Sequence, residues 1–321
     1  MKHIISVVFF LLAGAAGISH AQDRFPAKSV QLVAPFSPGT AVDFLARIVA
    51  DRLSPKLGQP VVVQNRPGAS GTIAADSVAK ALPDGYTILI VNSQHSANPA
   101  LFATLPYDTL RDFAGIALIA QAPSVMVVSP KLGVSTVKEF IALAKRQPGK
   151  INYATSGVGT NTHLGGAYFA GRAGVEMVGV PYKGLEMIAD MISGRMEAMF
   201  VPLPAVLSHI KDGKLIALGV TSREPLRMPL ELPTIESAGE LPGYEHITYY
   251  GFLAPAKVPK RILDQLSRDI RETVREKEVL DKLVAQAILP RDFGPAEFDA
   301  FLRADVERTG ALIKSLGAKG N

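Results

Sequence analysis

Residues 30–43 read Val-Gln-Leu-Val-Ala-Pro-Phe-Ser-Pro-Gly-Thr-Ala-Val-Asp. The first five residues form an apolar run that is typical of a buried strand, and prolines with a glycine then interrupt it at Pro35, Pro38 and Gly39. Apolar residues next recur at helical spacing, at Val42, Leu45, Val49 and Leu53. The stretch therefore predicts a strand, a tight loop and a helix. Free N–H groups at such a helix N-terminus make a small anion site without a cationic side chain.

The same pattern returns at residues 151–161. Residues 151–155 are strand-like, Ser-Gly-Val-Gly-Thr at 156–160 forms a loop, and Asn161 opens a helix. Two such units facing one another would hold one anion between them, which is the central hypothesis for this chain.

The remaining chain alternates strands and helices, which favours a parallel α/β sheet with right-handed crossovers. Thr136 and Glu139 form a capping box for a helix that ends near residue 147, and Pro55 is expected to end or kink the first helix. Residues 93–106 are polar and broken by prolines, so we expect an irregular loop there. Strand-like runs at 122–129 and 246–254 are expected to cross between two lobes.

Composition excludes several classes of protein. The 321 residues are 48% hydrophobic and 20% charged, as in a folded globular protein, and the chain has no cysteine. Disulfides, thiolate catalysis and cysteine-bound metals are therefore excluded. The formal net charge is +5, but acids and bases alternate along helices, which indicates solvated faces and no nucleic-acid partner.

The N-terminus predicts export. Lys2 gives a positive start, residues 4–18 are almost wholly apolar, and Ser19-His20-Ala21 is a small-x-small cleavage site. We interpret residues 1–21 as a signal peptide that is cleaved near Ala21, which places the mature protein in the periplasm.

Several loop motifs, taken in order, resemble those of the tripartite tricarboxylate transporter substrate-binding proteins, the Bug (TctC-like) family. The motifs run over nearly the whole mature chain: residues 34–39 with Asp43, 65–71, 83–87, 156–160 with His163, 180–184, 233–236 and 243–245. The resemblance implies the type II periplasmic-binding-protein fold, in which two α/β lobes enclose a central ligand cleft. It also implies a carboxylate ligand, held largely by backbone groups, that is delivered to membrane permease subunits. The sequence departs from the family at Thr40, where a second glycine is usual, and at Ala167, where an acid is usual. A tryptophan is also common near Tyr249.

We assign residues 22–122 and 246–321 to lobe 1 and residues 123–245 to lobe 2. Each candidate ligand-binding residue has a structural alternative. Asp43 either binds a ligand hydroxyl or amine, or is only a first-turn acid, and Thr160 and Asn161 either bind the ligand or cap a helix. The candidates are Phe36, Ser37, Gly39, Thr40, Ala41, Asp43, Ser93, His95, Ser156, Gly159, Thr160, Asn161 and Lys183.

We predict a monomeric binder of a small mono- or dicarboxylate, with no cofactor, no metal and no catalytic activity. A serine hydrolase would need Gly-x-Ser-x-Gly, whereas residues 154–158 read Ala-Thr-Ser-Gly-Val. Two alternatives stay open at this point. The first is a ferric-ion-binding protein, because Tyr249 and Tyr250 are adjacent, although a strand would direct their rings to opposite faces. The second is a ligand sensor without a role in transport.

Overall fold

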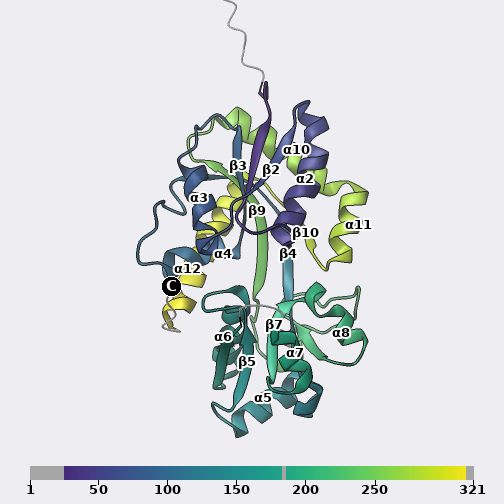
Figure 1. The fold of residues 1–321 in the computed structure, drawn as a ribbon. Coiled ribbons are helices and arrows are strands. Elements are labelled where there is room, and N and C mark those ends of the chain that lie inside the picture. The colour runs from purple at the N-terminus through teal and green to yellow at the C-terminus, as the bar shows by residue number, and fades with distance from the viewer. Residues whose placement is uncertain (1–24, 183–185, 316–321) are drawn as a thin grey trace, which may run out of the picture.

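The computed structural model describes residues 25–182 and 186–315. The predicted signal peptide, residues 1–21, and Lys183 therefore lie outside the described residues. The chain forms two α/β lobes that lie one above the other in Figure 1 and are joined by the long strands β4 and β9. The predicted α/β fold with two lobes is thus confirmed.

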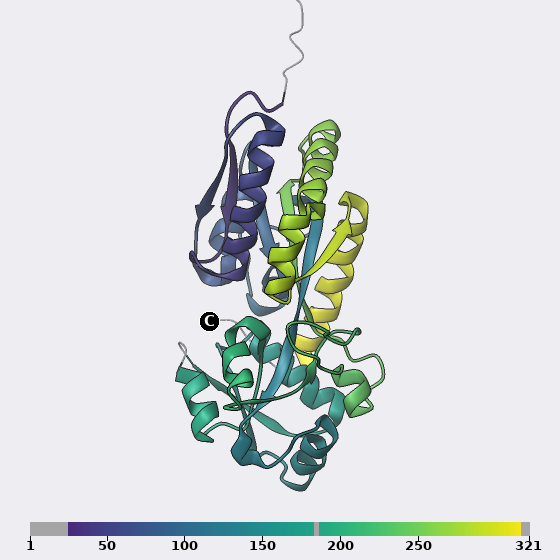
Figure 2. The same cartoon turned by 90° about the vertical axis from the view of Figure 1, so that its right-hand side faces the viewer.

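Lobe 1 is built on a mixed sheet in the order β2-β1-β3-β9-β4, with β10 pairing to β4 on its other side. The parallel strands β1, β2 and β3 require helical crossovers, and α2 supplies the first of them. Helices cover both faces of this sheet (Figure 2). The elements are β1 (Val30–Ala34), α2 (Ala41–Leu57), β2 (Val61–Asn65), η1 (Ala69–Gly71), α3 (Thr72–Ala79), β3 (Thr87–Asn92), α4 (Ser93–Leu101), β4 (Phe113–Val128), β9 (Ile247–Pro255), α10 (Lys260–Arg275), α11 (Lys277–Ala285), β10 (Leu289–Phe293) and α12 (Pro295–Ser315).

Lobe 2 repeats this arrangement on a smaller scale. Strands β6, β5 and β7 run parallel, and β4 pairs antiparallel to both β7 and β8. The elements are η2 (Pro130–Leu132), α5 (Val137–Arg146), β5 (Ile151–Thr155), α6 (Asn161–Ala173), β6 (Met177–Pro181), α7 (Glu186–Ser193), β7 (Ala198–Pro202), η3 (Leu203–Ala205), α8 (Leu207–Lys211), β8 (Ile216–Val220) and α9 (Ile235–Gly239). The predicted capping box is present, because the Thr136 hydroxyl accepts from the Glu139 N–H at 3.1 Å and the Glu139 carboxylate accepts from the Thr136 N–H at 3.2 Å.

Strand β4 changes its partners in the middle. Residues from Phe113 to Pro123 pair with β9, whereas residues from Ser124 to Val128 pair with β7 on one side and β8 lies on the other. Strand β9 begins opposite this switch, with Ile247 paired to Pro123. Two adjacent antiparallel strands therefore carry the chain between the lobes, and any change in the angle between the lobes must bend them.

Two local predictions were wrong, and a third placed the start of a crossing strand too late. Residues 93–101 form helix α4, whose N-terminus is capped by the Asn92 side chain accepting from Gln94 N–H, and Pro99 is tolerated near its end. Helix α2 continues past Pro55 to Leu57 and stops at Gly58, which takes the left-handed conformation. Strand β4 begins nine residues before position 122, because residues 113–121 are apolar and find partners in β9 and β10 on both edges.

Among the helices of residues 25–182 and 186–315, none combines the length and the apolar character needed to cross a bilayer.

Candidate ligand-binding cleft

The loop between β1 and α2 folds around Thr40. The Thr40 hydroxyl donates to the Ser37 carbonyl at 3.0 Å and accepts from the Asp43 N–H at 3.3 Å, so it caps α2. Gly39 has φ +85°, which glycine adopts without strain, and its N–H donates to the Asp43 carboxylate at 3.0 Å. Thr40, which stands where the family usually has a second glycine, is therefore an ordinary N-cap.

Asp43 is buried, and each of its two carboxylate oxygens accepts at least one hydrogen bond. Arg47 donates to Oδ2 at 3.0 Å, and the Asn65 amide donates to Oδ1 at 2.8 Å while also donating to the Phe36 carbonyl. These hydrogen bonds, led by that of Arg47, lower the pKa of Asp43 to about 2. Asp43 thus stabilises the loop conformation. Of the two roles considered for it, ligand binding and a structural first-turn acid, the hydrogen bonds favour the structural one.

The loop between β5 and α6 makes the same set of hydrogen bonds. The Thr160 hydroxyl donates to the Gly157 carbonyl at 2.7 Å and accepts from the His163 N–H at 3.4 Å. Gly159 has φ +76°, and its N–H donates to His163 Nδ1 at 3.3 Å, as Gly39 does to Asp43. The internal resemblance seen in the sequence is therefore a repeated loop conformation, with Thr40 and Thr160 in equivalent positions.

Both loops leave the first helical N–H group without an internal partner. The N–H groups of Ala41 and Asn161 make no hydrogen bond to the described part of the chain, as expected for the first residue of a helix. The two loops differ at the residue four positions after Gly39 and Gly159, which is Asp43 in the first loop and His163 in the second. Asp43 is an ionised carboxylate, whereas burial lowers the pKa of His163, whose Nδ1 acts as an acceptor and therefore carries no proton.

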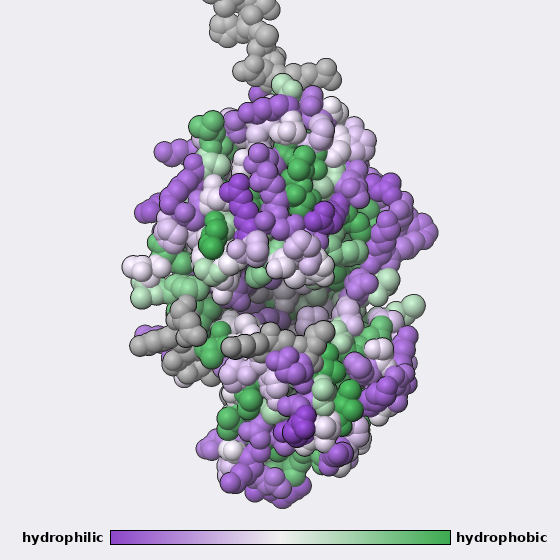
Figure 3. Space-filling model, in the orientation of Figure 1, coloured by the Kyte–Doolittle hydropathy of each residue, from purple (hydrophilic) through white to green (hydrophobic). Residues whose placement is uncertain are grey.

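A cleft between the lobes is lined by the first loop. Gly39, Thr40 and Ala41 are part of its lining, and its volume is about 420 Å³, in the range of small-molecule sites. Residues of α2, of the crossing strands and of two further segments form the rest: Phe44, Ala122, Pro123, Pro202, Pro204, Ala205, Tyr250, Gln286, Ala287 and Ile288. The molecular surface is visibly hollowed between the lobes (Figure 3).

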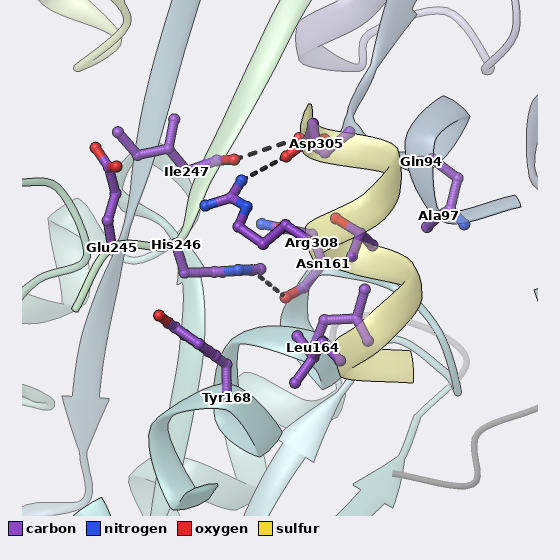
Figure 4. Close-up of a pocket in the computed structure, with 13 residues that line it drawn as sticks. Gln94, Ala97, Asn161, Leu164, Tyr168, Glu245, His246, Ile247, Asp305 and Arg308 are labelled. Carbon is purple, nitrogen blue, oxygen red and sulfur yellow. Dashed lines mark hydrogen bonds and ion pairs between the residues drawn. The ribbon is translucent and has the colours of Figure 1, made fainter. Parts of the chain in front are cut away.

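A second pocket lies between α12, α6 and the start of β9 (Figure 4). Asn161 lines it, and its carbonyl meets His246 Nε2 at 3.3 Å. Ser93 also lines it, but its hydroxyl donates to the Ile247 carbonyl and accepts from the Tyr249 N–H, which ties α4 to β9. Neither of these two pockets is lined by both loops.

His95 requires a correction. We expected it in an irregular loop beside the cleft, but it lies within α4 with 5% of its surface exposed. Its ring stacks on Tyr107 with centroids 5.9 Å apart and meets the edge of Phe113 at 5.2 Å. Burial lowers its pKa to about 4, so it is a neutral core residue.

The remaining candidates fall into three groups. Gly39, Thr40 and Ala41 line the cleft, with Phe36 and Ser37 behind them as carbonyl acceptors of the loop. Ser156 bonds to Thr162 through both its N–H and its hydroxyl, so it closes the second loop. Gly159 packs against α4, because a Cβ atom on it would lie 2.6 Å from Leu101 Cδ2.

Sequence reasoning missed the part of the lining formed by Pro202, Pro204, Ala205, Gln286, Ala287 and Ile288. All of them except Gln286 are apolar, and only the fold brings them to the cleft. The structure also shows whether Tyr249 and Tyr250 could bind a ferric ion together. The Tyr249 hydroxyl bonds to Ser96 Oγ at 2.8 Å inside the core, while Tyr250 lines the cleft from the other face of β9. The two rings cannot hold one ferric ion.

Comparisons with known proteins agree with this architecture. The family model described as the tripartite tricarboxylate transporter family receptor matches residues 45–318. A UPF0065 protein from the tcbD-tcbE intergenic region of Pseudomonas sp. strain P51 is 35% identical over 97% of this chain and 93% of its own length. Protein BugT of Bordetella pertussis is 32% identical over 99% of both chains.

Solved structures give the same result. R. palustris Rpa4515 with adipate has a TM-score of 0.80 and 33% identity, covering 92% of this chain and 100% of its own. MatC from Rhodopseudomonas palustris with bound malate has a TM-score of 0.75 and 26% identity, covering 90% of this chain and 100% of its own. The chain therefore belongs to the tripartite tricarboxylate transporter receptor family and is a solute-binding protein, not an enzyme.

Proposed function

We propose that this protein captures a small organic carboxylate between its lobes in the periplasm and, as a monomer, delivers it to the membrane subunits of a tripartite tricarboxylate transporter. The observation that carries the proposal is the repeated loop. Each copy ends in a helix whose first N–H group, at Ala41 or Asn161, has no partner among the described residues.

The chemistry of these ends favours an anion. Each helix N-terminus carries a partial positive charge of roughly half an electron. In the first loop, Arg47 and Asn65 compensate the Asp43 carboxylate, so its charge does not repel a second anion as an unpaired carboxylate would. Hydrogen bonds to a charged acceptor strengthen where water is excluded. Two of the similar structures hold adipate and malate, which supports a carboxylate for this chain as well.

The proposal includes closure of the lobes. A ligand that touches loop 37–41 and loop 156–161 together would bind the closed form better than the open one, and it would shift the population by that difference in affinity. The bending point is the pair of crossing strands, where β4 exchanges β9 for β7.

The experiment is a thermal-shift and calorimetric screen of mono- and dicarboxylates, followed by small-angle scattering. At one hundred times its dissociation constant, a carboxylate should stabilise the protein by about 2.7 kcal/mol. It should also reduce the radius of gyration. If no carboxylate raises the melting temperature, or if ferric ion alone does so, the proposal is wrong.

The variant Asn161→Pro tests the second loop. Thr160→Pro would be less informative, because the Thr160 N–H already donates to the Gly157 carbonyl at 3.3 Å. Proline at the first helical position removes the free donor and suits the helix. It also removes the Asn161 side-chain amide, which donates to Ser124 Oγ at 3.3 Å, and Asn161→Ala loses that amide as well. We expect Asn161→Pro to weaken carboxylate binding and to abolish the contraction in scattering, while Asn161→Ala, which keeps the N–H, retains both. Equal binding by the two variants would remove the second loop from the site.

A further inference from the structure

The C-terminal helix α12 packs against both lobes. Phe298 and Leu302 in its first half belong to an apolar cluster of lobe 1 that also contains Leu253 of β9. Ile313, near its other end, belongs to a different cluster, which Leu164 of α6 enters from lobe 2. Figure 2 shows α12, in yellow, running from lobe 1 down to lobe 2, and Figure 4 shows it beside α6. The helix therefore joins the lobes in addition to β4 and β9.

The second cluster, which we call the seam, is made of apolar side chains from both lobes. Its members come from α4 with its C-cap, from α6 and from α12: Ala97, Leu101, Phe102, Leu164, Leu312 and Ile313. Leu164 is 4% exposed, and a wider opening of the lobes would separate it from the others and expose it to water. Exposing one buried leucine shifts an equilibrium against the exposed state by roughly tenfold or more. The seam should therefore resist such an opening.

The seam also touches the second binding loop. Gly159 approaches Leu101 so closely that a Cβ atom on residue 159 would lie 2.6 Å from Leu101 Cδ2. The turn that follows is held at the crossing strands, because the Asn161 amide donates to Ser124 Oγ and the Asn161 carbonyl lies 3.3 Å from His246 Nε2. The loop thus rests against α4 of lobe 1 and against the point where the strands cross.

We infer that the C-terminal half of α12 and helix α4 form a strap that limits the opening of the unliganded protein. The strap keeps loop 156–161 against lobe 1 before a ligand arrives. The inference goes beyond the proposed function, and its main test needs no ligand. A loosened strap should also weaken binding, because an apparent dissociation constant rises as the fraction of binding-competent molecules falls. This effect should appear without a change in any residue that lines the cleft.

Interlobe distances measured by double electron–electron resonance test the strap. The chain has no cysteine, so spin labels at Lys145→Cys in lobe 2 and Lys257→Cys in lobe 1 are unambiguous. Both lysines are exposed, and neither belongs to the seam or to the lining of the cleft. Without ligand, we expect Leu164→Ala in this labelled background to give longer and more broadly distributed distances. Unchanged distances in a folded Leu164→Ala protein would overturn the inference.

Leu302→Ala is the matched control, because it truncates an equally buried leucine on α12 inside lobe 1. It should lower the melting temperature, as Leu164→Ala should, but leave the distances unchanged. Equal lengthening in both variants would show that general destabilisation is the cause, and the inference would be wrong. If Leu164→Ala does not fold, the milder Leu312→Gln at the half-buried edge of the seam takes its place, with the same expected lengthening and the same criterion.

Calorimetry with adipate and malate, the acids held by two similar structures, gives a second readout. For an acid that the wild type binds, Leu164→Ala should raise the dissociation constant about three- to tenfold, and Leu302→Ala should leave it unchanged. Wild-type affinity in Leu164→Ala would overturn the role of the strap in preparing the second loop. If the wild type binds neither these acids nor any other carboxylate in the screen, the proposed function is wrong, and the ligand-free distances alone decide on the strap.

Discussion

Replacement of Ala41 by proline is the sharpest test of where the carboxylate is bound. Ala41 is the first residue of α2, its side chain is exposed, and its N–H has no partner among the described residues. Proline suits this helical position. The preceding residue, Thr40, has φ −76° and ψ 162°, the extended conformation that a residue before proline prefers. Folding stability should therefore be unchanged or rise by up to about 1 kcal/mol.

The loss in binding should be much larger. A hydrogen bond to a charged group is worth about 1.5–3 kcal/mol. If the Ala41 N–H donates to the ligand carboxylate, its removal should raise the dissociation constant by roughly 10- to 150-fold. Calorimetric titration with the acid that binds the wild type most tightly measures this change, and thermal unfolding measures the stability.

Ala41→Ser is the matched control, because it keeps the N–H and adds a side chain of similar size. It should bind within about twofold of the wild type, a difference below 0.5 kcal/mol. A folded Ala41→Pro protein with wild-type affinity would refute the assignment of the carboxylate to the α2 N-terminus. Equal losses of affinity in Ala41→Pro and Ala41→Ser would indicate that the larger side chain crowds the cleft, and that the missing N–H donor is not the cause.

Three other predictions concern stability. The pKa of Asp43 is lowered to about 2 from 3.8, so its contribution is present above pH 3.8 and is lost as pH falls towards 2. Urea unfolding should thus show Asp43→Asn less stable than wild type at pH 7, with a smaller difference at pH 3. The pKa of His95 is lowered to about 4 from 6.5, so the unfolded state binds an extra proton between these values and stability falls as pH falls. His95→Phe should therefore lose less melting temperature than wild type between pH 7 and pH 4.5, and an equal loss would contradict this account. Gly159→Ala should destabilise by about 1–3 kcal/mol, since its φ is +76° and its Cβ would meet Leu101 at 2.6 Å. Gly39→Ala has φ +85° but no atom within 4 Å of its Cβ, so it should cost less in the same unfolding measurement.

Local chemistry made much of this protein readable from its sequence. Pro38, Gly39 and Thr40 predict a loop that ends one strand and caps the next helix, because glycine accepts positive φ and threonine satisfies a first-turn N–H. The repetition of this glycine–threonine pattern at Gly159 and Thr160 was equally visible in the sequence, and the second loop makes the same hydrogen bonds in the structure. Alternating strands and helices predicted the α/β lobes for the same reason, since period and turn residues are local properties.

Long-range packing decided the rest. Residues 93–101 carry polar groups and a proline, yet they form α4, because Asn92 caps the helix and its buried face packs against neighbouring elements. His95 is a cleft candidate by residue type and a core residue by position, which only Tyr107 and Phe113 around it could reveal.

The cleft itself shows the division between sequence and tertiary structure most clearly. Its anion end is encoded within one loop, from Gly39 to Ala41. The rest of its lining comes from distant segments of the chain, for example Pro202 and Ala205 from one and Ile288 from another, and these residues have no distinctive chemistry of their own. Which apolar residues line the cleft depends on how the two lobes meet. The arrangement of the lobes follows from the exchange of β9 for β7 along β4, and no local sequence pattern encodes it.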